Sequence, residues 1–146
     1  MPIDYKAFFH AGTVRICSSL DIDTMLSDCF RFLKDYIPLE MIELSVFDRK
    51  INSVRILARH ADFKVNHDIN TPIKVPPEAI AFAQSQKSKI FIFDSSIPNH
   101  PAQKLATILG ISDVVGIVLM LSIKDEKLGV VKVLSRGKQK FTKEHA

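Results

Sequence analysis

The chain has little of three features that would point directly to a particular chemistry: cysteine, glycine and long apolar segments. Its 146 residues include two cysteines, Cys17 and Cys29, too few for a disulfide framework or a cysteine-based zinc site. Its five glycines occur singly, so the sequence has no glycine-rich phosphate loop. No apolar run approaches the roughly 20 residues that a membrane-spanning helix needs. These absences argue against a disulfide-rich secreted domain, a nucleotide-binding loop and a membrane span.

Charge and the first residues argue against two further classes. The net charge is +4, and the basic residues are scattered except for a short cluster of Arg136, Lys138 and Lys140. No basic stripe is interleaved with aromatic residues, so we expect no direct binding to nucleic acid. The opening MPIDYKAFFH has no basic region followed by an apolar stretch, which predicts no signal peptide. We therefore expect a cytoplasmic protein without a membrane partner.

The composition, 47% hydrophobic and 25% charged residues, is that of an ordinary globular domain, and we assign residues 1–146 to a single one. Its first two predicted elements are helices. Residues 5–18 carry apolar side chains at helical spacing. In residues 21–37 the apolar positions follow the i, i+3, i+4, i+7 rule, with Asp21 as the N-cap and Pro38 as the stop.

The pattern then changes to the period of two that is typical of strands. Residues 41–47 and 54–59 alternate and form a predicted antiparallel hairpin around the turn DRKIN. After a polar loop at 61–74, the sequence predicts a helix in VPPEAIAFAQSQ, a strand in KIFIFD, a helix at 99–110, and strands at 114–123 and 128–135. This order predicts an α+β fold, with a central, mostly antiparallel sheet of five to six strands between helices and smaller elements.

Two long stretches of the chain resemble a known family. The stretch ICSSLDIDTMLSDCFRFLKDYIPLEMIELSVFDRK resembles the opening of a GAF domain, and LMLSIKDEKLGVVKVLSRGKQKFTKEH resembles its closing hairpin and the entry into its last helix. The resemblance covers essentially the whole chain. The start RICSSLDID is similar to the N-terminal sensory domains of bacterial sigma-54-dependent transcription activators. Histidine kinases and cyclic-di-nucleotide enzymes carry similar modules.

The resemblance implies a regulatory domain that binds an unknown small-molecule effector and signals to an attached output domain. It implies that the N- and C-terminal helices cover one face of the sheet and mediate a homodimer, and that short helices and loops form a pocket on the other face. On the first and last strands, alternation predicts that the side chains facing the pocket are Glu43, Ser45, Phe47, Val130, Lys132 and Leu134. The candidate ligand-binding residues are Glu43, Ser45, Phe47, Phe93, Asp94, Val118, Met120 and Lys132.

Lys132 is unusual because it interrupts a valine-rich strand. The first and last strands are neighbours in the family, so Glu43 and Lys132 can be cross-strand partners. An unpaired charge in an apolar pocket would be costly. Two interpretations follow and stay open: either residue contacts a polar or charged ligand, or the two satisfy each other.

The sequence predicts no metal site and no cofactor. Histidines and carboxylates do occur on predicted pocket-side loops, at His60, His67, Asp68, Asp94, His100 and Asp113. Of these, only His67 and Asp68 are close in sequence, and adjacent residues rarely converge on one metal ion. The two cysteines lie on the predicted helical layer, which does not suit a bilin thioether. The signature of the cyclic-nucleotide-binding members is not traceable.

Two other functions remain open. A small group of GAF proteins reduces free methionine sulfoxide with pocket cysteines, but Cys17 and Cys29 are predicted away from the pocket, so we expect no enzyme. The chain can also be a dimerisation module whose pocket is filled by its own side chains: Phe47, Phe82, Phe91, Phe93 and Met120. Finally, residues 141–144 read as the first turn of a helix, which we expect to lead toward the output domain.

Overall fold

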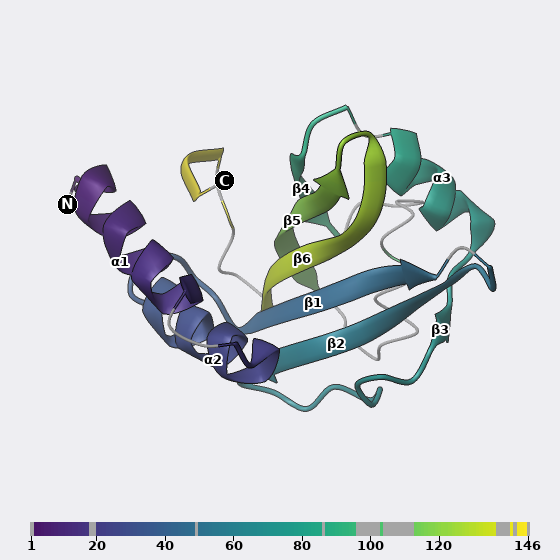
Figure 1. The fold of residues 1–146 in the computed structure, drawn as a ribbon, viewed down its shortest axis with the longest axis horizontal. Coiled ribbons are helices and arrows are strands. Elements are labelled where there is room, and N and C mark those ends of the chain that lie inside the picture. Colours follow the sequence, from purple (N-terminus) through teal and green to yellow (C-terminus); the bar gives the residue numbers. More distant parts are fainter. Residues whose placement is uncertain are drawn as a thin grey trace.

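The structure is a computed structural model, and it describes residues 2–17, 20–48, 50–85, 87–95, 103, 113–136, 141 and 143–145. Its helices are α1 (Tyr5–Cys17), α2 (Ile22–Leu33) and α3 (Pro77–Ser85), with a short 3₁₀ helix, η1, at Lys143–His145. Its strands are β1 (Met41–Asp48), β2 (Ser53–Ala61), β3 (Ile73–Lys74), β4 (Ile90–Asp94), β5 (Val114–Ile123) and β6 (Glu126–Arg136). Figure 1 shows the two N-terminal helices on one side of the sheet and α3 on the other.

The six strands form one sheet in the order β3-β2-β1-β6-β5-β4, and every neighbouring pair is antiparallel. This confirms the predicted α+β class and the adjacency of the first and last long strands. The interpretation of residues 61–74 as a loop was wrong at its end, because Ile73 and Lys74 pair with Val54 and Ser53 as β3. Two residues are too few to show a period of two, so no signal for this strand is visible in the sequence.

Helix α2 begins where the sequence predicts and ends earlier. Asp21 is its N-cap, and its Oδ2 accepts a hydrogen bond of 2.9 Å from the backbone N–H of Thr24. The helix was predicted to reach Ile37 but ends at Leu33. The residue before a proline avoids the α conformation, and the chain leaves the helix through tighter bonds such as Tyr36 N–H to Leu33 O, at 2.9 Å.

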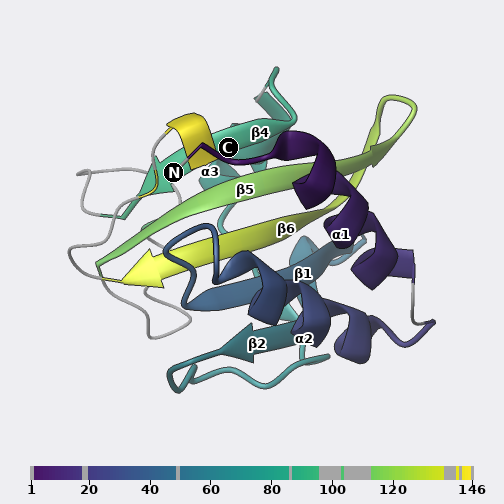
Figure 2. The same ribbon diagram turned by 90° about the vertical axis from the view of Figure 1, so that its left-hand side faces the viewer.

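The sheet buries a hydrophobic cluster on each of its two faces. The face under α2, which we call the helix face, is covered by Leu26 and Phe30 of that helix packing on Ile42 and Ala58. Figure 2 shows α2 lying across β1 and β2. The opposite face, which we call the loop face, carries the larger cluster. Its buried members are Met41, Ile56, Ile73, Val114, Val118, Met120, Val130 and Leu134.

Part of the loop face is covered by the segment between β2 and β3, residues 62–72, which we call the cover segment. Phe63 and Val65 of this segment pack against the loop-face cluster. At the other end of the sheet, Phe82 of α3 meets Phe91 of β4 edge to face, with ring centroids 5.7 Å apart. The predicted helix at 99–110 lies outside the described residues, except for residue 103.

The predicted helix start at residues 141–144 coincides with a short 3₁₀ turn at Lys143–His145. Phe141, just before it, is buried against Val115 and Ile117 on the helix face. No helix in the described part of the chain is long and apolar enough to cross a membrane.

Candidate functional site

The loop face holds a buried carboxylate at its centre, Glu43 on β1. Its two cross-strand neighbours are both basic, Arg59 on β2 and Lys132 on β6. Alternation along β1 puts Glu43 on the same face as Met41, and pairing brings the two cations to it from both sides. These three residues form what we call the charge cluster.

Each oxygen of the Glu43 carboxylate has its own partners. Lys132 Nζ forms an ion pair with Oε1, and the hydroxyl of Ser45 donates a hydrogen bond of 3.0 Å to the same oxygen. Arg59 Nε donates a hydrogen bond of 2.9 Å to Oε2. The side chain of Glu43 is 0% exposed, that of Lys132 8% and that of Arg59 9%. The pairing that the sequence suggested for Glu43 and Lys132 is therefore present, with Arg59 as a third member.

Burial and charge act in opposite directions on Glu43. Burial alone would raise the pKa of this carboxyl group, but the charges and hydrogen bonds of Lys132 and then Arg59 outweigh it and lower the pKa below its ordinary value. Glu43 is therefore ionised at neutral pH. With both basic groups charged, the cluster carries two positive charges and one negative, an excess of one buried positive charge.

The excess charge is best placed at Arg59, because its guanidinium is not fully used. Nη1 donates a hydrogen bond of 2.6 Å to the backbone carbonyl of His67 in the cover segment. Nη2 lies 2.8 Å from Glu43 Oε2, outside the angular range of a hydrogen bond, and this buried atom has no hydrogen-bond partner among the described residues. Buried donors without an acceptor are rare in proteins.

The structure brings most of the predicted site residues to one face. Glu43 and Lys132 belong to the charge cluster, and Ser45 donates a hydrogen bond to Glu43. Val118 and Met120 belong to the loop-face hydrophobic cluster, and Phe47 packs on it. Asp94 does not join them. It pairs with Val115, which faces the helix side, so Asp94 was wrongly predicted to face the pocket. Consecutive strand residues point to opposite faces, so Phe93 and Asp94 cannot share one. The side chain of Phe93 lies outside the described residues.

Arg59 is the member of the cluster that the sequence did not reveal. Simple alternation along β2 separates Arg59 from Ile56, but the pairing of β1 with β2 shifts register between Leu44 and Ser45. Leu44 lies opposite Ala58 and Ser45 opposite Ile56, so Leu57 is the extra residue of a bulge. The bulge puts Ile56 and Arg59 on the same face. Nothing in the local pattern of hydrophobicity marks its position.

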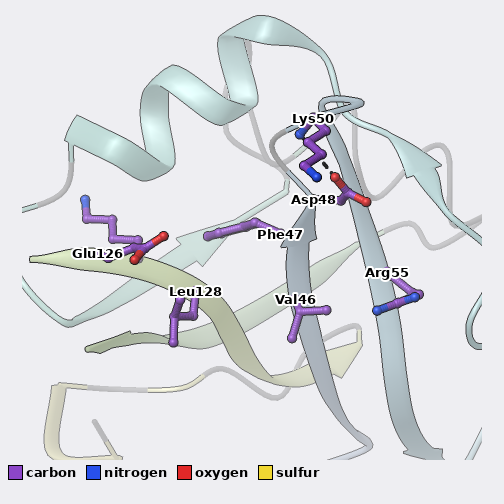
Figure 3. A pocket seen from close by; sticks show the side chains of 8 residues that line it. Val46, Phe47, Asp48, Lys50, Arg55, Glu126 and Leu128 are labelled. Atoms are coloured by element: carbon purple, nitrogen blue, oxygen red, sulfur yellow. Dashed lines mark hydrogen bonds between the residues drawn. The ribbon is translucent and has the colours of Figure 1, made fainter. Parts of the chain in front are cut away.

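A hollow lies at one end of the two central strands, where β1 and β6 separate beyond their last pair, Val46 and Gly129. We call it the fork groove; its volume is about 410 Å³. Its lining residues are Val46, Phe47, Asp48, Lys50, Arg55, Glu126, Lys127 and Leu128. Figure 3 shows Phe47 reaching from β1 toward β6, and Lys50 and Asp48 together at the tip of β1. No member of the charge cluster lines it.

The candidate metal ligands do not come together in the described part of the chain, where no group of three or more His, Cys, Asp and Glu side chains could hold an ion. His60 was expected near the pocket but lies toward α2, with Nε2 3.3 Å from Asp23 Oδ1. Cys29 is half-buried on α2, and burial raises the pKa of its thiol. The side chain of Cys17 is outside the described residues.

No protein-family model matches the sequence, and no curated protein matches it. Solved structures do match. The phycocyanobilin-bound GAF domain of a cyanobacterial phytochrome is 14% identical, with a TM-score of 0.67 over 99% of this chain and 87% of that one. The GAF domain of a phosphoenolpyruvate-protein phosphotransferase from Coxiella burnetii is 14% identical, with a TM-score of 0.67 over 96% of this chain and 82% of that one.

The GAF domain of a two-component sensor histidine kinase from Bacillus halodurans is 15% identical, with a TM-score of 0.60 over 87% of this chain and 84% of that one. Longer phytochrome fragments also match, and the chain spans 57% of one from R. palustris. These likenesses confirm that the chain has the GAF fold. At such low identity they carry no information on its ligand.

Proposed function

We propose that the chain is a sensory domain that binds a small molecule on its loop face and passes the signal to an attached output domain. The observation that carries this proposal is the charge cluster. Three charged side chains are buried on the sheet face against which the cover segment packs, although burying charges is costly. A fold that needed only stability could fill these positions with apolar residues.

The proposed signal is a shift in population between two arrangements of the elements over the loop face. A ligand can shift such an equilibrium only by binding one arrangement more tightly. The cover segment is the element best placed to respond, because the carbonyl of His67 is held directly by Arg59. The protein itself would carry out no catalysis.

For the output, we favour control of transcription in the cytoplasm, on the similarity of RICSSLDID to the sensory domains of sigma-54-dependent activators. The fold also suits a sensory domain of a histidine kinase, since one of its structural neighbours is described as such a domain. A co-purification of the full-length gene product with RNA polymerase, against one with a response regulator, distinguishes the two outputs.

We also propose that α1 forms a homodimer contact. Tyr5 and Phe9 lie one helical turn apart on α1 and are 64% and 65% exposed. Two large aromatic side chains on one stripe of a helix favour contact with a similar surface. Sedimentation of the chain tests this: we expect a dimer that the change of Tyr5 and Phe9 to serine converts to a monomer. A monomeric parent chain would refute the contact.

The alternative of a self-filled pocket has one specific observation in its favour. Phe47 and Phe91 pack against the loop-face cluster that holds Met120, and Phe82 packs on Phe91. These are four of the five side chains that the sequence named as internal filling.

Native mass spectrometry of the chain, purified without added ligand, tests the proposed function. We expect an added mass that is retained under gentle conditions and released on denaturation. A thermal-shift screen of small metabolites supplies the second measurement, in which at least one compound should raise the melting temperature. If native mass spectrometry gives the mass of the chain alone, and no compound in the screen raises the melting temperature, the self-filled module is favoured.

A further inference from the structure

We propose that Arg59 is the receptor for a carboxylate group of the ligand, so that the effector is a small monocarboxylic acid with an apolar body. This rests on the proposed function and names the chemical class of its ligand. Lys132, which the sequence singled out, is not the contact residue. Its ammonium group is paired with Glu43 Oε1, whereas Arg59 Nη2, although 2.8 Å from Glu43 Oε2, donates no hydrogen bond to any of the described residues.

The number of charges favours a single negative charge on the ligand. Glu43 balances one of the two cations, and one buried positive charge is left over. An incoming carboxylate carries one negative charge and makes the cluster neutral, whereas a phosphate dianion would reverse the imbalance. A buried charge is tolerated when it is paired, so the bound state removes the electrostatic penalty of the free state.

The donors of Arg59 favour the planar geometry of a carboxylate. Nε is used by Glu43, and the remaining edge of the guanidinium presents Nη1 and Nη2 side by side. Nη1 is held by a neutral backbone carbonyl and Nη2 by no acceptor among the described residues. A carboxylate can accept from both nitrogens in the two-pronged arrangement that arginine prefers, which a single carbonyl cannot do.

The surroundings define the rest of the ligand. The loop-face cluster around the charge cluster is built from Met41, Val118, Met120 and Val130, and Phe63 and Val65 of the cover segment pack against it. A ligand that displaces part of this segment would therefore meet aliphatic and aromatic side chains. An apolar body attached to the carboxylate is the complement of such a surface.

Binding at Arg59 would compete directly with the cover segment. A carboxylate that takes Nη1 removes the hydrogen bond to the His67 carbonyl. The segment is anchored next to this point by a second bond, from the N–H of Asn70 to the carbonyl of Ile56, at 2.7 Å. If the bond from Arg59 to the His67 carbonyl is lost and the bond from Asn70 to Ile56 is kept, the residues near His67 can move while Asn70 stays attached to β2.

The test compares acids with their uncharged amides at constant ionic strength. Butyrate and benzoate are titrated against butyramide and benzamide, with nitrogen-15 NMR of the chain as the readout. We expect the acids to bind at least tenfold more tightly than the amides, and to shift the signals of Arg59 Nε and of residues 66–71. Equal affinity for acid and amide would overturn the inference, as would the absence of any binding by the acids.

Three variants locate the effect. Arg59→Lys keeps the charge but loses the paired donors, and should reduce acid affinity at least tenfold without changing amide affinity. Arg59→Met leaves a balanced pair of Glu43 and Lys132 and should abolish the preference for acids. Arg55→Met, which removes an exposed cation of the same strand, is the matched control and should change nothing. Circular dichroism establishes that each variant is folded.

The same experiments separate the two proposals. If Arg59→Lys binds acids as tightly as the parent chain, Arg59 is not the receptor. A neutral compound retained in native mass spectrometry by both proteins would then leave the sensory function standing and remove only the carboxylate. Inorganic phosphate is the second anion in the series, and tighter binding of phosphate than of butyrate and benzoate overturns the assignment of a monocarboxylate.

Discussion

At the scale of single residues, the three members of the charge cluster are not equivalent. Glu43 is the shared anion, and each of its cations leaves a balanced pair behind when it is removed. Replacing Glu43 leaves two buried cations facing each other without a counter-charge. The loss of the one carboxylate should therefore be far more damaging than the loss of either base.

We expect Glu43→Gln to lower the free energy of unfolding by about 3–5 kcal/mol, the range for breaking a buried ion pair from one side. Lys132→Met should lower it by less than about 2 kcal/mol, because Arg59 still pairs with Glu43 and the methionine fills a similar volume. Urea denaturation of the three proteins at pH 7 measures the difference. Equal losses in the free energy of unfolding for Glu43→Gln and Lys132→Met would contradict the role of Glu43 as the anion shared by both cations.

The carboxylate of Glu43 also makes the stability of the fold depend on pH, and its contribution is lost in acid. The pKa of Glu43 is lowered in the folded protein relative to its ordinary value near 4.5, so the folded state holds the ionised form more strongly. Its contribution is complete above the unfolded pKa and is lost as the pH falls through the folded one. We expect the advantage of the parent chain over Glu43→Gln to be constant from pH 7 to about pH 5 and to shrink below pH 4.5. Urea titrations at several pH values measure it, and an advantage that grows in acid would contradict this assignment.

Sequence reasoning found two of these three residues for a physical reason. A charged side chain that interrupts an apolar strand is visible in one dimension, and alternation assigns it to a face, as for Lys132 and Glu43. Arg59 lies in a strand whose alternation is broken by a bulge, and a bulge is decided by the partner strand. Asp94 was named as a candidate on a pocket-side loop, but it is the last residue of β4, and consecutive strand residues such as Phe93 and Asp94 point to opposite faces.

At the scale of elements, the contact between β1 and β6 depends on one glycine. A Cβ atom added at Gly129 would lie 2.1 Å from the backbone oxygen of Ser45, too close for any side chain. The clash involves backbone, which cannot rotate away. This close approach sits at the last pair before the two strands separate, so it defines where the fork groove begins.

We expect Gly129→Ala to destabilise the fold by roughly 1–3 kcal/mol, the range for overpacking that forces the backbone to shift. Gly12→Ala on α1 is the matched control. Its added Cβ would lie 3.6 Å from Phe32, an ordinary contact, and alanine in a helix should stabilise by roughly 0.5–1 kcal/mol. Thermal unfolding measures both effects: the melting temperature should fall for Gly129→Ala and rise for Gly12→Ala. A harmless Gly129→Ala would mean that the strands can separate further without loss.

Elements with strong internal patterns were predictable, and those set by their neighbours were not. Helix α2 was recognised from its apolar stripe and its Asp21 cap, both of which are local. Its end at Leu33 is set by the turn that leads into β1, and β3 exists only because β2 offers an edge to Ile73. Local sequence specifies the start of a helix better than the length of a short edge strand.

At the scale of the whole molecule, stability should fall from the centre of the sheet toward α1. Strands β1 and β6 are hydrogen-bonded on both sides, and hydrophobic clusters cover both faces. Helix α1 contributes no residue to the three clusters found among the described residues, and Figure 1 shows it extending from α2 away from the strands. Its main attachment is aromatic, with Phe8 stacked 5.4 Å from Phe32 and edge to face with Tyr36 at 4.9 Å.

Hydrogen exchange measured by mass spectrometry should show this gradient. We expect amides in residues 5–17 to exchange through local opening, at least a hundredfold faster than those of β1 and β6, which need global unfolding. The proposed homodimer adds a concentration dependence, because a partner on Tyr5 and Phe9 would protect α1 while leaving the sheet unchanged. Changing Phe8 to alanine should speed exchange in α1 further and leave β6 unaffected. Protection of α1 equal to that of β1, at low protein concentration, would show that the helix and the sheet unfold as one unit.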